Sequence, residues 1–392
     1  MDLIRNVNGK FLRCGYTTGV CAAAAAKAAT ALLLSGEKAD SVQIKTPSGI
    51  NLTIEIAEAS VSGETVSCAV RKDGGDDPDA TNGILIFSAV RRIAEGVEID
   101  GGEGVGRVTK PGLDQPVGAA AINSVPRKLI GEAVSEVCEK YGYFGGISVT
   151  VSVPGGEKLA LRTFNPNIGI VGGISIIGTS GIVEPMSNKA LVDTIKLELR
   201  QLYVSGGRSV LLTPGNYGEN FARDVLRLSS SENISCSNFI GDAIDYAVEL
   251  GFKKILLVGH IGKLVKLGIG LTNTHSANGD GRMETLVACA LEAGAPLSLL
   301  RSVLGCVTTD AALELIEKEG LLPETLEILK KRIDRFLLKR VPDDTDIGFV
   351  CFTNASGSGR ILIQSENSEK LLDLWRTSQW STLLAPAAAH PT

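Results

Sequence analysis

The side chains best suited to chemistry follow a short apolar run at residues 255–258. This run is predicted to form a strand buried on both faces, and a glycine-rich turn and a helix come after it. His260 in the turn titrates near neutral pH, so it is a candidate general base. Gly259 and Gly262 would let a ligand approach the backbone, and Lys263 would attract an anion. The alternative is a helix start that needs its glycines only for packing.

The turn matches neither a phosphate-binding loop nor a metal site. A P-loop has an earlier glycine before its Gly-Lys pair and a serine or threonine after it, and this chain has Leu257 and Leu264 at those positions. His260, His275 and Asp280 lack the close spacing of metal ligands. We therefore predict no protein-bound metal.

A second cluster of reactive side chains is an acidic loop at residues 72–79. It holds four carboxylates within seven residues, together with glycines and a proline. Asp76 and Asp77 are candidates for a general base or for carboxylates that orient a substrate. The order of the residues does not match a calcium-binding EF-hand loop. The alternative is a solvated turn, which is what most such runs form.

Two further segments have the composition of anion-binding sites. Thr17 or Thr18 is predicted to cap the alanine-rich helix that follows, and the free N–H groups at a helix start attract anions. Residues 101–112 contain alternate glycines together with Arg107 and Lys110, so a ligand would meet both open backbone and positive charge. A capped helix and a glycine-rich hairpin, each without a ligand, are the alternatives.

The predicted strands divide the chain into two domains. Over residues 1–165 apolar and polar side chains alternate, which predicts an α+β domain with antiparallel or mixed strands. Over residues 166–380 the strands are continuous apolar runs between helices, which predicts an α/β domain with a mostly parallel sheet. The tail, 381–392, lacks periodicity and is predicted to be disordered. The apolar runs are 168–171 or 174–177, 210–212, 255–258, 347–352 and 361–363, and helices are expected at 187–204 and 323–340.

Three polar, glycine-rich loops are expected at one edge of the parallel sheet. They span residues 178–185, 213–218 and 259–263. Loops at the carboxyl ends of parallel strands meet in a crevice that binds ligands, so together they predict a pocket. The alternative is three ordinary turns.

The composition excludes several classes of protein. The formal net charge of −5 and the pI of about 5.5 argue against a general nucleic-acid binder. The eight cysteines include no CxxC pair, which indicates reduced thiols in a cytoplasmic protein. The start of the chain lacks a secretory apolar core, and the apolar run at 20–34 is short and contains Lys27. We therefore expect no membrane partner.

Long motifs in a fixed order make this sequence resemble one known family. They are Gly15-Tyr16-Thr17-Thr18-Gly19 and residues 72–79, 104–112, 121–127, 170–184, 214–218 and 259–282. Over most of its length, from about Arg13 to Ile363, the chain is similar to the cobalt-precorrin-5B C-1-methyltransferase family of the anaerobic cobalamin pathway. That family commonly has a histidine where this chain has Asn82, so no proton acceptor is carried over at that position.

The resemblance implies an enzyme that transfers a methyl group from S-adenosylmethionine to C-1 of cobalt-precorrin-5B, giving cobalt-precorrin-6A. The cobalt would arrive with this corrinoid substrate, whose carboxylates suit arginine and lysine partners. The first domain would bind the substrate and the second the methyl donor, with Glu184 accepting hydrogen bonds from the ribose. Donor contacts are expected from Thr179, Ser180, Gly181, Glu184, Pro214, Gly215, Asn216, Gly259 and Gly262. Substrate contacts are expected from Thr17, Thr18, Lys72, Arg107, Lys110, Arg127, Lys263, Asn273, His275 and Arg282.

Two other functions compete with this one. A nucleotide-binding phosphoryl-transfer enzyme would use the turn at 259–263, and the failed P-loop match counts against it. A non-catalytic tetrapyrrole carrier would explain the basic side chains but not a second, donor-sized pocket. Saturable binding of S-adenosylmethionine and S-adenosylhomocysteine, compared with ATP, separates these functions. The sequence leaves open whether the protein is a monomer or a homo-oligomer.

Overall fold

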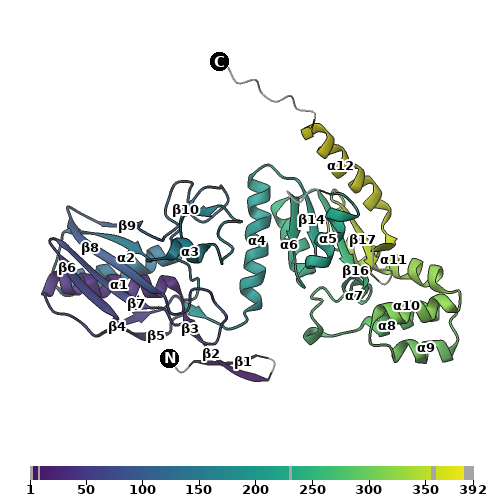
Figure 1. Cartoon of the computed structure of the whole chain (residues 1–392), viewed down its shortest axis with the longest axis horizontal. Helices are drawn as coiled ribbons and strands as arrows, with labels where there is room; N and C mark the ends of the chain where they lie inside the picture. The colour runs from purple at the N-terminus through teal and green to yellow at the C-terminus, as the bar shows by residue number, and fades with distance from the viewer. Residues whose placement is uncertain (1–2, 8, 229–231, 355–358, 384–392) are drawn as a thin grey trace, which may run out of the picture. The chain divides into compact units, whose positions relative to one another are not determined.

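The chain folds into two compact units, residues 1–188 and 189–392 (Figure 1). The computed structural model describes residues 3–7, 9–228, 232–354 and 359–383. The sequence placed the division near residue 165, whereas residues 166–188 pack with the first unit. Ile174, Ile176 and Ile182 are buried in the first unit's core, which explains why this segment stays with it.

The first unit is built on a five-stranded sheet of order β6-β7-β8-β11-β9. Every neighbouring pair is antiparallel except β11 and β9, which run parallel. The predicted α+β domain with antiparallel or mixed strands is thereby confirmed. The strands are β6 (Glu58–Ser62), β7 (Thr65–Arg71), β8 (Leu85–Ile93), β9 (Val97–Gly101) and β11 (Gly146–Ser152).

Four short antiparallel pairs surround this sheet. One pair is the hairpin of β4 (Ser41–Lys45) and β5 (Asn51–Glu55). The other pairs are β1 (Ile4–Val7) with β2 (Lys10–Arg13), β3 (Gly15–Tyr16) with β13 (Ile182–Val183), and β10 (Arg107–Val108) with β12 (Ile170–Val171).

Helix α1 (Thr18–Ser35) lies in the core of the first unit. Its alanines at 22–26 are fully buried, and their small side chains let the helix pack closely on α2 (Ser124–Lys140) and on β7 and β8. Among the described residues α1 is the one helix long and apolar enough to cross a membrane, and 67% of it is buried inside the unit. A core position therefore accounts for its composition. The third helix of this unit is α3 (Gly156–Ala160).

The apolar segment 168–177 is not part of the parallel sheet that the sequence predicted for it. Ile170 and Val171 pair antiparallel with β10, and Ile174 and Ile176 make isolated bridges within the first unit. A short apolar run has the same composition whether it is a sheet strand or a buried connection, so periodicity alone does not distinguish the two.

The second unit has a five-stranded sheet of order β15-β14-β16-β17-β18. The first four strands are parallel and only β18 runs antiparallel, which confirms the predicted α/β arrangement. The strands are β14 (Ser209–Thr213), β15 (Asn233–Ser235), β16 (Lys254–His260), β17 (Asp346–Thr353) and β18 (Arg360–Gln364).

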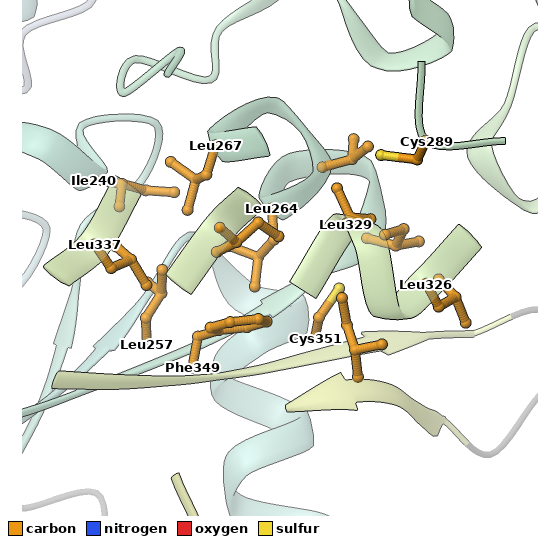
Figure 2. Close-up of a cluster of buried hydrophobic side chains, with 14 of the residues drawn as sticks. Ile240, Leu257, Leu264, Leu267, Cys289, Leu326, Leu329, Leu337, Phe349 and Cys351 are labelled. Atoms are coloured by element: carbon orange, nitrogen blue, oxygen red, sulfur yellow. The ribbon is translucent and has the colours of Figure 1, made fainter. Parts of the chain in front are cut away.

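Helices cover both faces of this sheet. Helices α5 (Asn216–Asp224) and α12 (Glu366–Leu383) pack on one face, with Phe221 and Trp375 in the apolar layer. On the other face, Leu326, Leu329 and Leu337 of α11 (Leu322–Leu338) lie over Phe349 and Cys351 of β17 (Figure 2). The predicted helices at 187–204 and 323–340 therefore form, as α4 (Asn188–Val204) and α11. Of the predicted disordered tail, 384–392 lies outside the described residues.

The remaining helical segments of the second unit connect these layers. Helix α6 (Ile240–Leu250), α7 (Ile261–Leu264) and the 3-10 turn η2 (Val265–Ile269) contribute to the same buried layer as α11. The others are η3 (Ser276–Asn278), α8 (Arg282–Glu292), α9 (Leu297–Leu304) and α10 (Thr309–Lys318).

All eight cysteines are free thiols, and six of them are buried. Burial raises the pKa of Cys21 and of Cys236 to about 12. Cys138 and Cys306 are the two that are partly exposed. The reduced thiols expected from the cysteine spacing are thus present in both units.

Candidate functional site at the switch point of the second sheet

The carboxyl edge of the second unit's sheet contains a topological switch point. The chain passes from β14 to its outer neighbour β15, and then crosses to the other side of β14 to form β16 and later β17. Helices α5 and α6 leave toward opposite faces of the sheet. In open α/β sheets ligands bind in the crevice at such a point, so the ends of β14 and β16 are the candidate site.

The loops after β14 and β16 pack against each other through glycines. A Cβ on Gly259 would lie only 2.8 Å from Cγ of Pro214, and a Cβ on Gly218 would lie 2.5 Å from the carbonyl oxygen of Val258. Gly215 begins α5 with a φ of 94°, a left-handed conformation that favours glycine. The predicted loops 213–218 and 259–263 therefore form one continuous surface.

His260 is the last residue of β16 and caps helix α7. Its Nδ1 accepts a hydrogen bond from the backbone N–H of Gly262 at 3.1 Å. The ring meets Phe352 edge-on, with 5.5 Å between centroids, and lies 6.5 Å from the ring of Tyr217. Burial lowers the pKa of His260, while the carboxylate of Asp310 acts in the opposite direction. The imidazole is therefore held in place and favoured in its neutral form.

Lys263 lies on the side of the site nearest β14 and β15. Its Nζ donates to the carbonyl of Ser237 at 3.2 Å and is 3.4 Å from the position of a Cβ on Gly215. Ser237 has a φ of 51°, a conformation that costs energy outside glycine and is often found at functional sites. Burial lowers the pKa of Lys263, with the thiol of Cys236 opposing the shift. Within the described residues the bond to Ser237 is the one hydrogen bond of the Lys263 side chain, which leaves two N–H groups of the ammonium to donate to an anionic ligand.

Four residues at this edge were not picked out from the sequence. Tyr217 is 71% exposed in the first turn of α5, and its ring offers a flat apolar surface beside His260. Thr353 ends β17 and donates to Asp310 of α10 at 2.5 Å. Three of the four lie at a strand end or within four residues after one: Tyr217, Ser237 and Thr353. A search of the residues that follow each predicted strand would therefore have found them. Asp310 follows no strand, and only the folded chain places it here.

The third loop predicted at this edge, residues 178–185, belongs to the first unit instead. Its β13 pairs with β3, and a Cβ on Gly181 would lie 2.8 Å from Cβ of Thr46. Glu184 forms an ion pair with Arg5. Ser180 hydrogen-bonds within its own turn, through its hydroxyl to the carbonyl of Ile182. Only two of the three predicted loops therefore lie at the sheet edge, because the segment before the third loop is not a strand of that sheet.

The start of α1 is covered by protein rather than open to an anion. The hydroxyl of Thr17 accepts from the N–H of Val20, and the N–H of Gly19 donates to the carbonyl of Ile177. Thr18 Oγ1 accepts from the N–H of Ile177 at 2.8 Å. Of the two threonines predicted to bind substrate, Thr17 thus caps α1 and Thr18 fastens it to residues 175–177.

The acidic loop is held together from within. Lys72 is 2% exposed and donates to Asp79 at 2.5 Å. Burial opposes ionisation of Asp79, but the Lys72 ammonium and the hydrogen bonds from Thr81 bring its pKa below the ordinary value. The ammonium would have to leave Asp79 to reach a carboxylate of a substrate, so the geometry gives no support to the predicted contact from Lys72, which stays a prediction.

The two predicted catalytic carboxylates bind backbone N–H groups. Asp76 accepts from the N–H of Arg13 at 2.6 Å, and Asp77 accepts from the N–H of Met186 at 2.9 Å. Both lie in the first unit, whereas His260 lies in the second. Asn82, whose position was compared above with a histidine common in the family, accepts from the N–H of Gly74 in the same loop at 2.9 Å. These contacts fix the loop's shape.

The basic side chains of the first unit differ in how far they are engaged. Arg107 makes a two-point ion pair with Asp100, at 2.8 and 3.1 Å. Arg127 donates to the backbone carbonyls of Ile122 and Ile99, at 2.8 and 2.7 Å. Burial lowers the pKa of Arg127. Lys110 is exposed and donates one hydrogen bond, to a carbonyl at 3.2 Å. Of the three, Lys110 keeps the most capacity for a ligand.

The polar loop before α8 is organised around a buried lysine. Lys266 is 3% exposed and donates to two carbonyls of the loop at 3.1 and 3.0 Å. Asp280 lies 3.7 Å from Lys266 and 2.5 Å from Arg282. Asn273 accepts from the N–H of His275, and His275 Nδ1 accepts from the N–H two residues further on. The predicted substrate contacts from Asn273, His275 and Arg282 are thus side chains that already stabilise their own loop.

Comparison with known proteins identifies the family. The model of the CbiD family matches residues 5–185, and the model of the CbiD C-terminal domain matches residues 273–366. The chain is 49% identical over 314 residues to the cobalt-precorrin-5B C(1)-methyltransferase of Ruminiclostridium cellulolyticum, covering 80% of this chain and 82% of the relative. It is 43% identical over 373 residues to the enzyme of the same name from Listeria welshimeri, covering 94% and 98%.

This chain belongs to the CbiD family. A crystal structure described as a cobalamin biosynthesis protein (cbiD) from Archaeoglobus fulgidus is 28% identical in sequence, with a TM-score of 0.39. That match covers 70% of this chain and 86% of the archaeal chain. The family models and the curated relatives, one of which matches 94% of this chain, confirm the resemblance found from the motifs.

Two open cavities in this CbiD-family chain lie away from the switch point. One of about 680 Å³ is in the first unit, lined by Leu3, Tyr16, residues 50–55 and Asp73. The other, of about 610 Å³, lies between η2 and α11 and is lined in part by Arg335 and by other cations of α11. Cations near the end of a helix are favoured by its dipole without any ligand. Neither cavity includes the loops after β14 and β16.

Metal-ligating side chains do not gather anywhere in the described ranges of this CbiD-family chain. No group of three or more His, Cys, Asp and Glu residues there has a geometry that would hold a metal ion. His260 and His275 each direct Nδ1 to a backbone N–H instead.

Proposed function

We propose that this protein transfers a methyl group from S-adenosylmethionine to C-1 of cobalt-precorrin-5B, giving cobalt-precorrin-6A. The observation that carries the proposal is membership of the CbiD family, with relatives named as this methyltransferase that match 94% of the chain. The cobalt belongs to the substrate. A cytoplasmic location is part of the same proposal, supported by the eight free thiols.

We place the methyl donor at the switch point of the second unit. Gly215 and Gly262 leave partly exposed backbone there, Gly259 packs the two loops together, and Pro214 and Asn216 complete the loop between β14 and α5. The exposed ring of Tyr217 suits stacking with an adenine. Lys263 suits the carboxylate of the methionine part, because its ammonium is half-buried and its one hydrogen-bond partner in the described part of the chain is a carbonyl.

The chemistry needs alignment more than it needs a strong base. The S–CH3 bond breaks and its electron pair stays on sulfur, so the sulfonium becomes the neutral thioether S-adenosylhomocysteine. The new C–C bond at C-1 takes its electron pair from the conjugated macrocycle, which receives the positive charge that sulfur loses. Holding the sulfonium carbon and C-1 in line is worth several kcal/mol, roughly 7–11 in well-oriented intramolecular reactions. Rigid glycine loops at a strand edge are suited to that task.

The substrate-binding role of the first unit remains part of the proposal. A corrinoid with several carboxylates needs cations that are not already paired, and Lys110 fits this requirement best. Arg107 would have to exchange its pair with Asp100 for a substrate carboxylate. Asp76 and Asp77 would support the loop that faces the substrate, since each binds a backbone N–H.

The deciding experiment has two parts. Calorimetric titration of the whole protein with S-adenosylmethionine, S-adenosylhomocysteine and ATP should give saturable binding of the first two only. Incubation with S-adenosylmethionine and cobalt-precorrin-5B should add one methyl group to the corrinoid by mass spectrometry. Binding of ATP alone would favour phosphoryl transfer. Binding of the corrinoid without methyl transfer would favour a carrier.

A further inference from the structure

The hydrogen bond at Nδ1 of His260 determines which nitrogen of the neutral ring carries the proton. A nitrogen that accepts from an amide N–H presents its lone pair to that N–H. Since Nδ1 accepts from Gly262 at 3.1 Å, the single proton of the neutral imidazole is on Nε2. The free nitrogen of His260 is therefore an N–H donor and has no lone pair to offer.

The cap and the aromatic neighbours of the ring disfavour protonation at Nδ1, and one carboxylate acts in the opposite direction. A proton on Nδ1 would face the N–H of Gly262 and remove the cap of α7. The ring packs at a steep angle against Phe352 and lies near the ring of Tyr217, and its partial burial disfavours the charged form. Asp310 is the acidic group that would favour the imidazolium, and its carboxylate already accepts from Thr353. A base at this position would have to break the cap to take a proton.

We infer that His260 binds the methyl donor by donating a hydrogen bond from Nε2 and takes no proton during methyl transfer. The inference rests on the proposed function and replaces the general-base role expected from the sequence. Nε2 makes no hydrogen bond within the part of the chain that the structure describes, and it lies at the edge where the donor is placed. An oxygen of S-adenosylmethionine, from its carboxylate or its ribose, is the acceptor class that fits a neutral N–H.

Two amide substitutions separate the roles of the two nitrogens. In His260→Asn the side-chain oxygen can still accept from Gly262, because asparagine is a good helix cap, but no N–H remains at the position of Nε2. In His260→Gln the longer side chain can place an N–H near the position of Nε2 but does not cap. Neither amide is a base near neutral pH. His275→Asn is the matched control for stability, since His275 caps η3 with the same geometry.

Donor binding and turnover are then measured on the full-length protein. We expect the Kd for S-adenosylhomocysteine to rise about tenfold in His260→Asn and about threefold or less in His260→Gln. We expect kcat with both substrates saturating to fall by less than about tenfold in either variant. A general base would instead leave Kd unchanged and lower kcat by about 10² to 10⁴ in both variants, which would overturn the inference.

Nuclear magnetic resonance gives a test that needs neither substrate nor activity. In protein labelled with ¹⁵N at histidine, the His260 signals, identified by their loss in His260→Asn, should show the tautomer protonated at Nε2. The Nε2 proton should shift when S-adenosylhomocysteine is added. Protonation at Nδ1 in the free protein would refute the inference whatever the Kd and kcat of the variants. Failure of the wild-type protein to bind S-adenosylhomocysteine would instead refute the proposed donor site.

Discussion

The ammonium of Lys72 is among the most deeply buried charges in the described structure, at 2% exposure, and its carboxylate partner is Asp79. Removing one member of such a pair leaves the other without compensation. We expect Lys72→Met to lower the free energy of unfolding by about 2–4 kcal/mol, measured by urea denaturation. We expect the KM for the corrinoid to stay unchanged in the folded fraction.

The double variant Lys72→Met/Asp79→Asn is the control for this pair. Because it removes both charges, we expect it to recover at least about half of the lost stability. A single variant that remains as stable as the wild type but raises KM would show that Lys72 contacts substrate after all.

The carboxyl group of Asp334 on α11 should make stability depend on pH. Burial raises its pKa from 3.8 to about 6, with Glu366 and Glu327 adding to the shift and Lys330 opposing it. The folded state therefore binds more protons than the unfolded state between these values, so this group's contribution to stability falls as pH rises through that window. We expect Asp334→Asn to be more stable than the wild type by about 1 kcal/mol at pH 8, since Asp334 is only partly buried, and equal to it at pH 3. Thermal denaturation at both pH values measures the difference in stability between Asp334→Asn and the wild type. A difference of the same size at pH 3 and pH 8 would contradict the prediction.

The residue types showed which functional groups were available. They did not show which of these groups already have hydrogen-bond or ion-pair partners in the fold. Hydrogen-bond donors suited to a polycarboxylate are present in Lys72, Arg127 and Thr18. Each of these side chains already forms hydrogen bonds with other groups of the protein. The sequence located His260 because it follows an apolar run. It did not show that Nδ1 would cap α7, since that depends on the backbone direction after β16.

At the level of elements, the packing of two loops through glycine should be essential to the donor site. A Cβ on Gly259 would lie 2.8 Å from Pro214 Cγ and 2.9 Å from Leu264 Cδ2, and a proline ring has little freedom to move. We expect Gly259→Ala to separate the loops after β14 and β16, weaken binding of S-adenosylhomocysteine at least about tenfold, and cost about 1–3 kcal/mol of stability.

Gly305→Ala is the matched control in the same unit. Gly305 has an ordinary φ of −78°, and the nearest atom to its Cβ would be 3.4 Å away. We expect it to leave the calorimetric affinity for S-adenosylhomocysteine unchanged. Equal affinity of the Gly259→Ala and wild-type proteins would place donor binding elsewhere.

The sequence predicted strands correctly where an apolar run is covered by helices on both faces of the sheet. Residues 255–258 and 347–352 became central parallel strands because both of their faces are covered by helices. Residues 168–177 have a similar composition but bridge to Val105 and Ile122 in the first unit. Strand order was not predictable in this way. The switch between β14 and β16 arises from which neighbour each strand pairs with, and composition does not encode that.

At the level of the whole molecule, the two units have separate cores and should fold separately. The first core is made of residues up to Ile182, and the second unit's cores begin at Ile195. We expect a fragment of residues 188–392, starting at the first residue of α4, to unfold cooperatively on its own. It should bind S-adenosylhomocysteine with the affinity of the full chain, by calorimetry, while residues 1–187 should not bind it. Loss of binding in a cooperatively folded 188–392 fragment would show that the first unit contributes to the donor site.

Because most of the thiols are buried, the rate at which they react with an alkylating agent would measure how often each unit opens locally. Only a thiolate reacts with an alkylating agent, and burial suppresses both access and ionisation. A buried cysteine can therefore be labelled only while its surroundings are transiently open, and its labelling rate reports how often that happens. Cys138 in the first unit and Cys306 in the second, both partly exposed, calibrate the rate without opening. Six buried cysteines, three in each unit, are thus natural reporters of local opening: Cys14, Cys21, Cys68, Cys236, Cys289 and Cys351.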